Sequence, residues 1–165
     1  MIMMNTRVRP AVAGDAPQMT LLLNAIIAAG GTTAYQTPFD HDKMRDHCIT
    51  RDSLICSHIA ISNGRLSGFQ YLAAPAETMP DGWAVIATFV AVDRAKMGIG
   101  QKLFAATRHC AKQAGVATID ATIRADNTGG LKYYGGLGFV DYAQIPDAPL
   151  ADGQLVTRIR KKLML

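Results

Sequence analysis

The chain has 165 residues, of which 49% are hydrophobic and 18% are charged, so its composition excludes disordered and fibrous proteins. This length suits one domain over residues 1–165, which can bury a core without disulfides or metals. A net charge of +4 suits an anionic ligand as well as nucleic acid, but no basic stretch is interleaved with aromatic residues, so we expect no nucleic-acid partner.

The cysteines and the apolar runs indicate where the protein resides. Cys48, Cys56 and Cys110 are odd in number and widely spaced, which fits reduced thiols used for packing and excludes a C-x-x-C metal site. Residues 1–4 lack the basic region of a secretory leader, and the apolar run at 21–29 is too short to cross a bilayer. We therefore expect a soluble cytoplasmic protein that uses no metal and no membrane.

The first third of the chain predicts one short strand and two helices. Residues 6–9 have the composition of a strand that stops before a proline. Asp15 is the expected N-cap of a helix over 16–29, which a pair of glycines ends. A second helix is expected to begin with Asp40 as its cap and to run toward residue 49.

The middle of the chain predicts a hairpin followed by a central strand. The β-rich runs at 54–61 and 66–73 are separated by Asn63-Gly64, a dipeptide that favours the type I′ turn. The segment 83–92 is almost continuously apolar, which predicts a strand buried on both faces in the middle of a sheet.

The last third alternates helices and strands. Apolar residues recur at helical spacing over 100–114, and a strand at 116–123 follows directly, which favours a right-handed crossover between parallel neighbours. A short helix at 128–135 and strands at 140–145 and 155–162 complete the chain. Residues 146–153 are expected to form a loop, and the basic residues near 160 a solvated strand face. The order predicts an α+β protein, with a mixed sheet covered by helices on both faces.

A glycine pair stands where the apolar strand meets the helix. Gly98 and Gly100 would let the backbone approach a ligand, and the unpaired amides of the helix start suit a phosphate group. On their own they could equally form a tight turn. Tyr134 follows one strand later and could act as an acid, although a single tyrosine more often packs in a core.

This block resembles the GNAT superfamily of acyl-CoA-dependent N-acetyltransferases, and in element order the resemblance covers nearly the whole chain. The residues that carry it are Phe89-Val90-Ala91-Val92, Met97-Gly98-Ile99-Gly100-Gln101-Lys102-Leu103, Asp126-Asn127, Tyr133-Tyr134 and Leu137-Gly138-Phe139. One position departs from the family pattern: Ala95 stands where the family has glutamine or arginine, three residues before the first glycine.

The resemblance implies a mostly antiparallel mixed sheet that is splayed into a V, with acetyl-CoA as cosubstrate. Val90 and Val92 would bind the pantetheine arm through their backbone, and the amide of Val90 would polarise the thioester carbonyl. Asn127 would contact this arm, cap the following helix, or do both. The main-chain cradle for the pyrophosphate would comprise Lys96, Met97, Gly98, Ile99, Gly100, Gln101 and Lys102.

The resemblance assigns Tyr134 as the general acid that protonates the leaving thiolate. Tyr133 would point about 100° away on a helix, so the two rings cannot serve one sulfur. The base that takes the amine proton stays open among Glu77, Asp81, Asp120 and His109. Glu77 is the candidate we name, since it precedes the central strand and could act through water, although a solvated loop charge is the commoner role.

The expected reaction is transfer of an acetyl group from acetyl-CoA to a primary amine of a small molecule. Direct attack in a ternary complex is expected because no cysteine lies in the motif. Two alternatives are a non-catalytic acyl-CoA-binding sensor or scaffold, which Ala95 favours, and acetylation of a macromolecular amine. Two closing strands would allow a homodimer. The acceptor would be selected by Tyr35, Phe39, Asp40 and Asp42, within residues 31–42.

Overall fold

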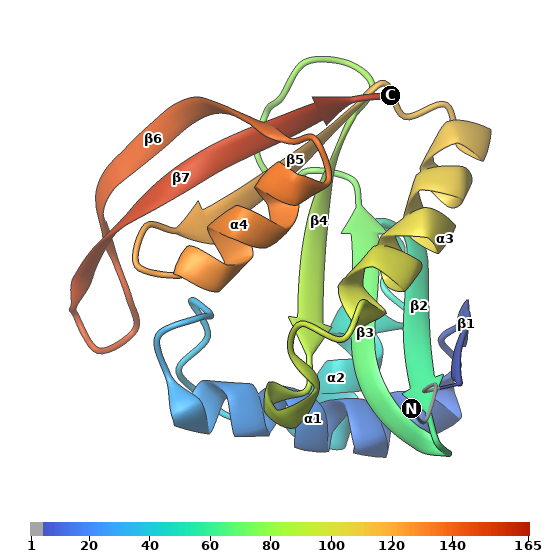
Figure 1. The fold of residues 1–165 in the computed structure, drawn as a ribbon. Coiled ribbons are helices and arrows are strands. Elements are labelled where there is room, and N and C mark those ends of the chain that lie inside the picture. Colours follow the sequence, from blue (N-terminus) through green and yellow to red (C-terminus); the bar gives the residue numbers. More distant parts are fainter. Residues whose placement is uncertain (1–4) are drawn as a thin grey trace.

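A single mixed sheet of seven strands forms the centre of the protein, in the order β1-β2-β3-β4-β5-β7-β6 (Figure 1). The computed structural model describes residues 5–165. The strands are β1 (Thr6–Pro10), β2 (Leu54–Ser62), β3 (Arg65–Ala73), β4 (Trp83–Val90), β5 (Thr118–Arg124), β6 (Val140–Pro149) and β7 (Leu155–Met164). The helices are α1 (Ala16–Ala29), α2 (His41–Cys48), α3 (Ile99–Gln113) and α4 (Thr128–Gly136), and the 3-10 turns are η1 (Ala13–Asp15) and η2 (Val92–Arg94). The predicted order of elements is confirmed.

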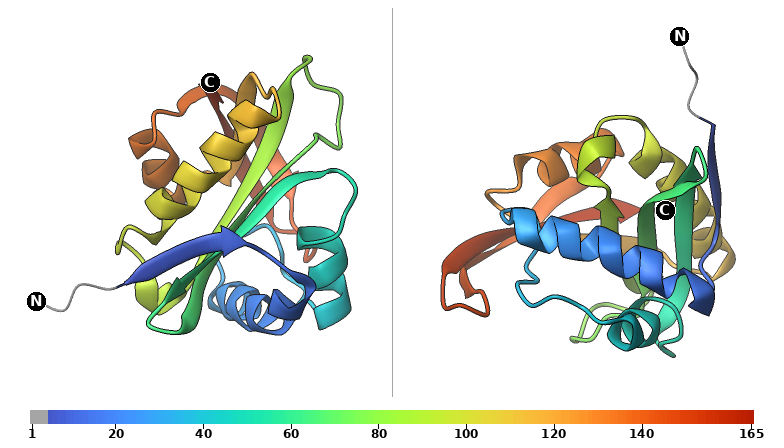
Figure 2. Two further views of the ribbon diagram at one scale, coloured as in Figure 1. Left: turned by 90° about the vertical axis from the view of Figure 1, so that its right-hand side faces the viewer. Right: turned by 90° about the horizontal axis from the view of Figure 1, so that it is seen from below.

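The helices cover both faces of the sheet (Figure 2). On one face α1 and α2 pack against β2, β3 and β4 around Leu23, Met44 and Phe69. On the other face α3 and α4 pack against β3, β4 and β5, around Phe104 and Tyr134. Because side chains alternate along a strand, successive residues of β3 enter different cores.

The sheet opens into a V between β4 and β5, which are parallel and joined through α3. The two strands pair only at their beginnings, where Trp83, Ala84 and Val85 meet residues 118–120. Residues 86–90 of β4 still pair with β3 but no longer with β5. All the other strand pairs in the described residues are antiparallel. The expected splayed sheet is therefore present (Figure 1).

The prediction for the central strand was wrong at its end and in its burial. The strand stops at Val90, and Val92 lies instead in η2 with 61% of its surface exposed. Only Ala84, Ile86 and Phe89 are buried along β4. The splay removes β5 from one side of β4, so a run of apolar residues does not become a strand buried on both faces.

The local turn and cap predictions are confirmed at two places and in part at a third. Asn63 and Gly64 both have positive φ, 51° and 75°, as a type I′ turn requires. The Asp40 carboxylate accepts a hydrogen bond from the Lys43 amide at 2.7 Å. Asp15 occupies the predicted N-cap position of α1, but its side chain makes no cap hydrogen bond, because its carboxylate is bound by the Arg9 guanidinium and by the amide of Val12.

The C-terminal strands are longer than predicted. β6 continues to Pro149, into the expected loop, because Ala148 pairs with Val156 of β7. Within residues 5–165 no helix is long and apolar enough to cross a membrane. Cys48, Cys56 and Cys110 are free thiols.

Candidate functional site

The start of α3 offers a cluster of unpaired backbone amides. Gly98 is its N-cap and has the left-handed conformation, with φ of 78°. The first helical hydrogen bond runs from the Lys102 amide to the Gly98 carbonyl at 3.2 Å, so the amides of Ile99, Gly100 and Gln101 lack intrahelical partners. The helix dipole adds positive potential at this point, which suits a phosphate group.

Two lysines flank this helix start. Lys96 and Lys102 are both exposed, and Lys96 also has positive φ, at 65°. Ala95 and Met97 are exposed beside them and contribute backbone rather than charge. The sequence-predicted cradle is thus brought together at one place, between the end of β4 and the first turn of α3.

Gly100 is required here for a reason that the sequence did not indicate. A Cβ at this position would lie 2.6 Å from Cε2 of Tyr133, closer than real Cβ contacts come. The Tyr133 hydroxyl donates a hydrogen bond to the Gly100 carbonyl at 2.7 Å. The glycine therefore admits the ring of a tyrosine from α4, and this ring braces the start of α3.

Tyr134 points to a different place from its neighbour. Its hydroxyl lies 2.7 Å from Oγ1 of Thr88, on the part of β4 that has separated from β5. The side chain is buried, and this burial raises the pKa of the Tyr134 phenol above its ordinary value. At neutral pH the hydroxyl is protonated and can donate a proton or a hydrogen bond into the V.

A buried glutamine joins the two tyrosines. Nε2 of Gln70 on β3 donates to Thr88 Oγ1 at 2.8 Å and to the Tyr133 hydroxyl at 3.1 Å. Gln70 is fully buried, and its Oε1 has no hydrogen-bond partner. Gln70 and Thr88 were not predicted as site residues, although each is a polar residue inside an apolar strand.

Asn127 caps α4 and holds a neighbouring loop. Its Oδ1 accepts from the Gly130 amide at 2.9 Å, and its Nδ2 donates to the Thr32 carbonyl at 3.1 Å. Next to it, the buried Arg124 donates to the Thr33 carbonyl at 3.0 Å and forms an ion pair with Asp126. These contacts fix the connection between α1 and α2 against the end of β5.

The acidic candidates lie on β5 and near the closed end of the V. The Asp120 carboxylate is 3% exposed and accepts hydrogen bonds from Tyr142 and Arg160, so it belongs to a buried polar network between β5 and the C-terminal strands. Glu77 is 64% exposed and forms an ion pair with Arg160 at 3.0 Å. Arg160 is only 15% exposed and does not form part of a solvated strand face, which corrects the prediction. Asp81 and His109 are exposed.

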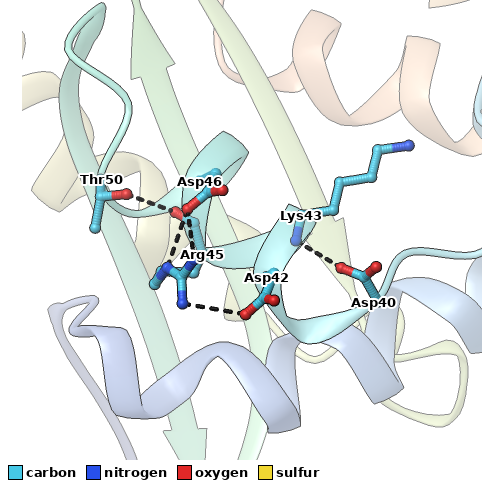
Figure 3. Close-up of polar contacts among 6 residues, drawn as sticks. All are labelled: Asp40, Asp42, Lys43, Arg45, Asp46 and Thr50. Carbon is cyan, nitrogen blue, oxygen red and sulfur yellow. Dashed lines mark hydrogen bonds and ion pairs between the residues drawn. The ribbon is translucent and has the colours of Figure 1, made fainter.

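The residues expected to select the acceptor separate into two groups. Asp40 is used as a helix cap, and Asp42 binds Arg45 at 3.1 Å on the surface of α2 (Figure 3). Phe39 is 4% exposed and packs in the core, so it offers no free aromatic surface. Of the four predicted residues, Tyr35 is the one that lines a cavity of about 420 Å³. The other residues around this cavity include Gly31, Thr33, Gln36, Arg124, Asp152 and Gln154.

Comparison with known proteins agrees with this geometry. The sequence model of the acetyltransferase (GNAT) family matches residues 23–139, which include the start of α3 and all of α4. No curated protein is similar enough in sequence to count as a match.

Solved structures of the same fold cover almost the whole chain. An N-acetyltransferase from Staphylococcus aureus Mu50 is 17% identical, with a TM-score of 0.84 over 97% of this chain and 98% of that one. The protein yncA of Salmonella typhimurium, solved with its cofactor acetyl-CoA, is 19% identical, with a TM-score of 0.79 over 97% and 94%. A ribosomal-protein-alanine N-acetyltransferase from Brucella melitensis is 18% identical, with a TM-score of 0.83 over 96% and 99%.

Because these sequence identities are low, the solved structures establish the fold alone. The family assignment rests on the family model, which matches well over half of the sequence. The chain therefore belongs to the GNAT family of acetyltransferases, enzymes that depend on acetyl-CoA.

Proposed function

We propose that the protein transfers an acetyl group from acetyl-CoA to a primary amine of a small molecule, by direct attack in a ternary complex. The observation that carries this proposal is the buried hydroxyl of Tyr134, held by Thr88 where β4 has parted from β5. A protonated phenol at this point can stabilise a thiolate as it leaves. Tyr134 is accordingly the proposed general acid.

The residues at the start of α3 fit the cosubstrate, which supplies an acyl group activated as a thioester. The unpaired amides of residues 99–101 would bind its pyrophosphate, with Lys96 and Lys102 adding charge. Ala95 contributes no charged side chain, so this binding depends on the backbone cradle. Asn127 would support the cradle from α4, where it already serves as a cap.

The unpaired edge of β4 would bind the pantetheine arm. Beyond Val85 this edge no longer pairs with β5, which leaves backbone groups near Val90 available for hydrogen bonds. Val92 would contribute from η2 rather than from the strand, through its exposed surface. The Val90 amide would polarise the thioester carbonyl as negative charge develops on its oxygen.

The size of the cavity beside Tyr35 favours a small acceptor. Its volume of about 420 Å³ lies in the range of small-molecule pockets, and its rim includes the carboxylate of Asp152. A carboxylate attracts an ammonium group to the site. Glu77 is a candidate for the base that deprotonates this group, and its exposed carboxylate forms an ion pair with Arg160.

The proposal is tested by incubating the protein with acetyl-CoA and each of four small primary amines (phenethylamine, methionine, lysine and spermidine), and separately with an alanyl peptide. Release of free thiol is followed, and the acetylated product is identified by mass. We expect turnover of at least one amine, and Tyr134→Phe should lose it while still binding acetyl-CoA. Binding of acetyl-CoA without turnover of any amine would favour a sensor. Turnover of an alanyl peptide alone would favour a macromolecular acceptor.

A further inference from the structure

We propose that Tyr35 and His47 form the proton-accepting relay of the reaction, on the face of the sheet opposite Tyr134. In this relay the Tyr35 hydroxyl contacts the acceptor amine, and His47 acts through Tyr35 by taking up the proton. The inference rests on the proposed function, since it supplies the base that amine acetylation needs.

The imidazole of His47 is held by two phenols. Its Nε2 lies 3.0 Å from the Tyr35 hydroxyl and 3.4 Å from the Tyr71 hydroxyl. Both rings meet the imidazole edge to face, with centroids at 6.2 Å and 5.9 Å. The shorter contact is the one to Tyr35, so Nε2 is placed to accept the Tyr35 proton.

The strands identify the face on which this cluster lies. Tyr71 pairs with Ala87, and the next pair along the two strands is Gln70 with Thr88. Because successive side chains point to opposite faces, Tyr71 projects away from the face on which Thr88 binds Tyr134. A thioester bound between β4 and β5 would therefore have Tyr134 on one side and the phenol cluster on the other.

Tyr35 connects this cluster to the acceptor cavity. It lines the cavity of about 420 Å³, and its ring lies 6.4 Å from that of Phe89, the residue after Thr88. β4 itself contains no ionisable side chain, so a base must come from another element. Tyr35 belongs to the connection between α1 and α2 that Arg124 fixes against β5 through the carbonyl of Thr33.

Burial and the neighbouring positive charges keep the imidazole of His47 neutral. Burial, then the nearby Arg51 and Lys43, lower the pKa of His47 below its ordinary value. No described Asp or Glu forms an ion pair with it, and Tyr71 and Cys48 are protonated because burial raises the pKa of each group. A neutral imidazole at pH 7 is the form that can accept a proton.

The helix that carries His47 is held firmly. The Asp40 carboxylate caps α2, and Arg45 forms ion pairs with Asp42 and Asp46 on its outer surface (Figure 3). Lys43 lies 4.2 Å from the centroid of the Phe39 ring. These contacts stabilise α2 itself, while its buried residues Met44 and Cys48 pack it against the sheet. The imidazole of His47 is directed toward Tyr35 and Tyr71.

The step balances without any further reactant. The amine nitrogen attacks the thioester carbonyl carbon, forming the C–N bond, and the C–S bond breaks. The proton lost by the amine goes to the Tyr35 oxygen as the Tyr35 hydroxyl proton passes to His47 Nε2, which becomes an imidazolium. The thiolate takes the proton of Tyr134, which becomes a phenolate. Solvent water then removes one proton from the imidazolium and returns one to the phenolate, so that both groups regain their starting forms.

The test compares His47→Gln and Tyr35→Phe with the wild type and with His41→Gln, which removes an exposed histidine from the start of the same helix, α2. The turnover number at saturating acetyl-CoA is measured from pH 5 to pH 9, with whichever of the four amines turns over fastest. The ionisation of the amine is the same for every variant. Thermal unfolding and acetyl-CoA binding are measured on each protein.

The wild type should lose activity as the pH falls through the pKa of His47, because the imidazolium cannot accept a proton. His47→Gln should lower turnover at pH 8 by about 100-fold and abolish this acidic limb, while acetyl-CoA binding stays unchanged. Tyr35→Phe keeps the aromatic packing and should lower turnover similarly. His41→Gln should match the wild type.

Two results would overturn the relay in different ways. If the wild type acetylates an amine and both Tyr35→Phe and a folded His47→Gln keep its pH profile, the relay is wrong and the proposed function stands. If His47→Gln does not fold, the pH profile of Tyr35→Phe decides the question alone. If the wild type releases no thiol with any amine or with the alanyl peptide, the proposed function and the relay both fail.

Discussion

The two faces of the sheet are built in different ways around the same opening. On the face of α3 and α4, Tyr134, Thr88, Gln70 and Tyr133 form a continuous chain of hydrogen bonds that ends at the carbonyl of Gly100. On the face of α1 and α2, aromatic rings from separate elements gather around one imidazole. The first face carries a buried hydrogen-bond network beside its apolar core, whereas the second gathers aromatic rings and borders a cavity.

This difference suggests that one face of the sheet binds the cosubstrate and the other binds the acceptor. A cosubstrate shared by a whole family can be bound by backbone amides and a fixed tyrosine, so the residues of that face belong to a recognisable motif. An acceptor that differs between enzymes must be bound by variable side chains. The distinction can be tested by changing one face at a time.

The largest effect is expected at the hydroxyl that faces the V. Tyr134→Phe should lower turnover by about 100-fold or more, because it removes the proposed acid and leaves the ring in place. Steady-state kinetics with acetyl-CoA would measure this loss. Tyr133→Phe is the matched control, and it should instead raise the KM for acetyl-CoA, since its hydroxyl braces the start of α3. An equal loss of turnover in both variants would contradict the separation of their roles.

The next largest effect is expected in the cradle. Gly100→Ala places a methyl group 2.6 Å from Cε2 of Tyr133, so the ring must move and the hydrogen bond to the Gly100 carbonyl is lost. We expect acetyl-CoA to bind about tenfold more weakly and the free energy of unfolding to fall by about 1–3 kcal/mol. Calorimetric titration and chemical denaturation measure the two quantities.

Gly135→Ala is the control for this change, since a Cβ there meets nothing within 4 Å. It should stabilise α4 by about 0.5–1 kcal/mol, because alanine favours the helix over glycine. Equal acetyl-CoA affinity in the Gly100 and Gly135 variants would show that the cradle does not depend on the contact with Tyr133.

A smaller effect is expected from the residue that links the two tyrosines. Gln70→Leu removes two hydrogen bonds but also removes an Oε1 that has no partner, so the free energy of unfolding should change by less than about 1 kcal/mol. Turnover should fall by about tenfold, corresponding to about 1.4 kcal/mol of activation free energy, since Thr88 loses one constraint on its orientation. Wild-type turnover with unchanged stability would remove Gln70 from the positioning network.

The smallest effects are expected at the helix caps, one on each face. Asp40→Ala and Asn127→Ala should each lower the free energy of unfolding by about 1 kcal/mol, because each removes a side-chain acceptor from a helix start. Only Asn127→Ala should also weaken acetyl-CoA binding, since Asn127 lies on the face of the cradle. Weaker acetyl-CoA binding in Asp40→Ala would contradict the division between the faces.

Local features of the fold followed from the sequence. The turn at Asn63-Gly64, the cap at Asp40 and the helix after Gly98 all depend on residues that are close in the chain, and each was predicted. The exceptions were Asp15 and Val92. Asp15 is bound by Arg9 from β1, and Val92 lies in a turn that ends the strand early, and neither neighbourhood is visible in the local pattern.

The sequence by itself indicated the family, which the comparison with known proteins confirms. It also predicted the glycine cradle and the choice of Tyr134 over Tyr133, because these predictions depend on spacing within one block. Only the tertiary structure decided which groups meet across the sheet. Gln70 reaches both tyrosines because β3 pairs with β4, and Tyr35 meets His47 because α1, α2 and their connection fold onto the same face. Spacing along the chain carries no information about such contacts, since they depend on strand register and on which face each helix covers.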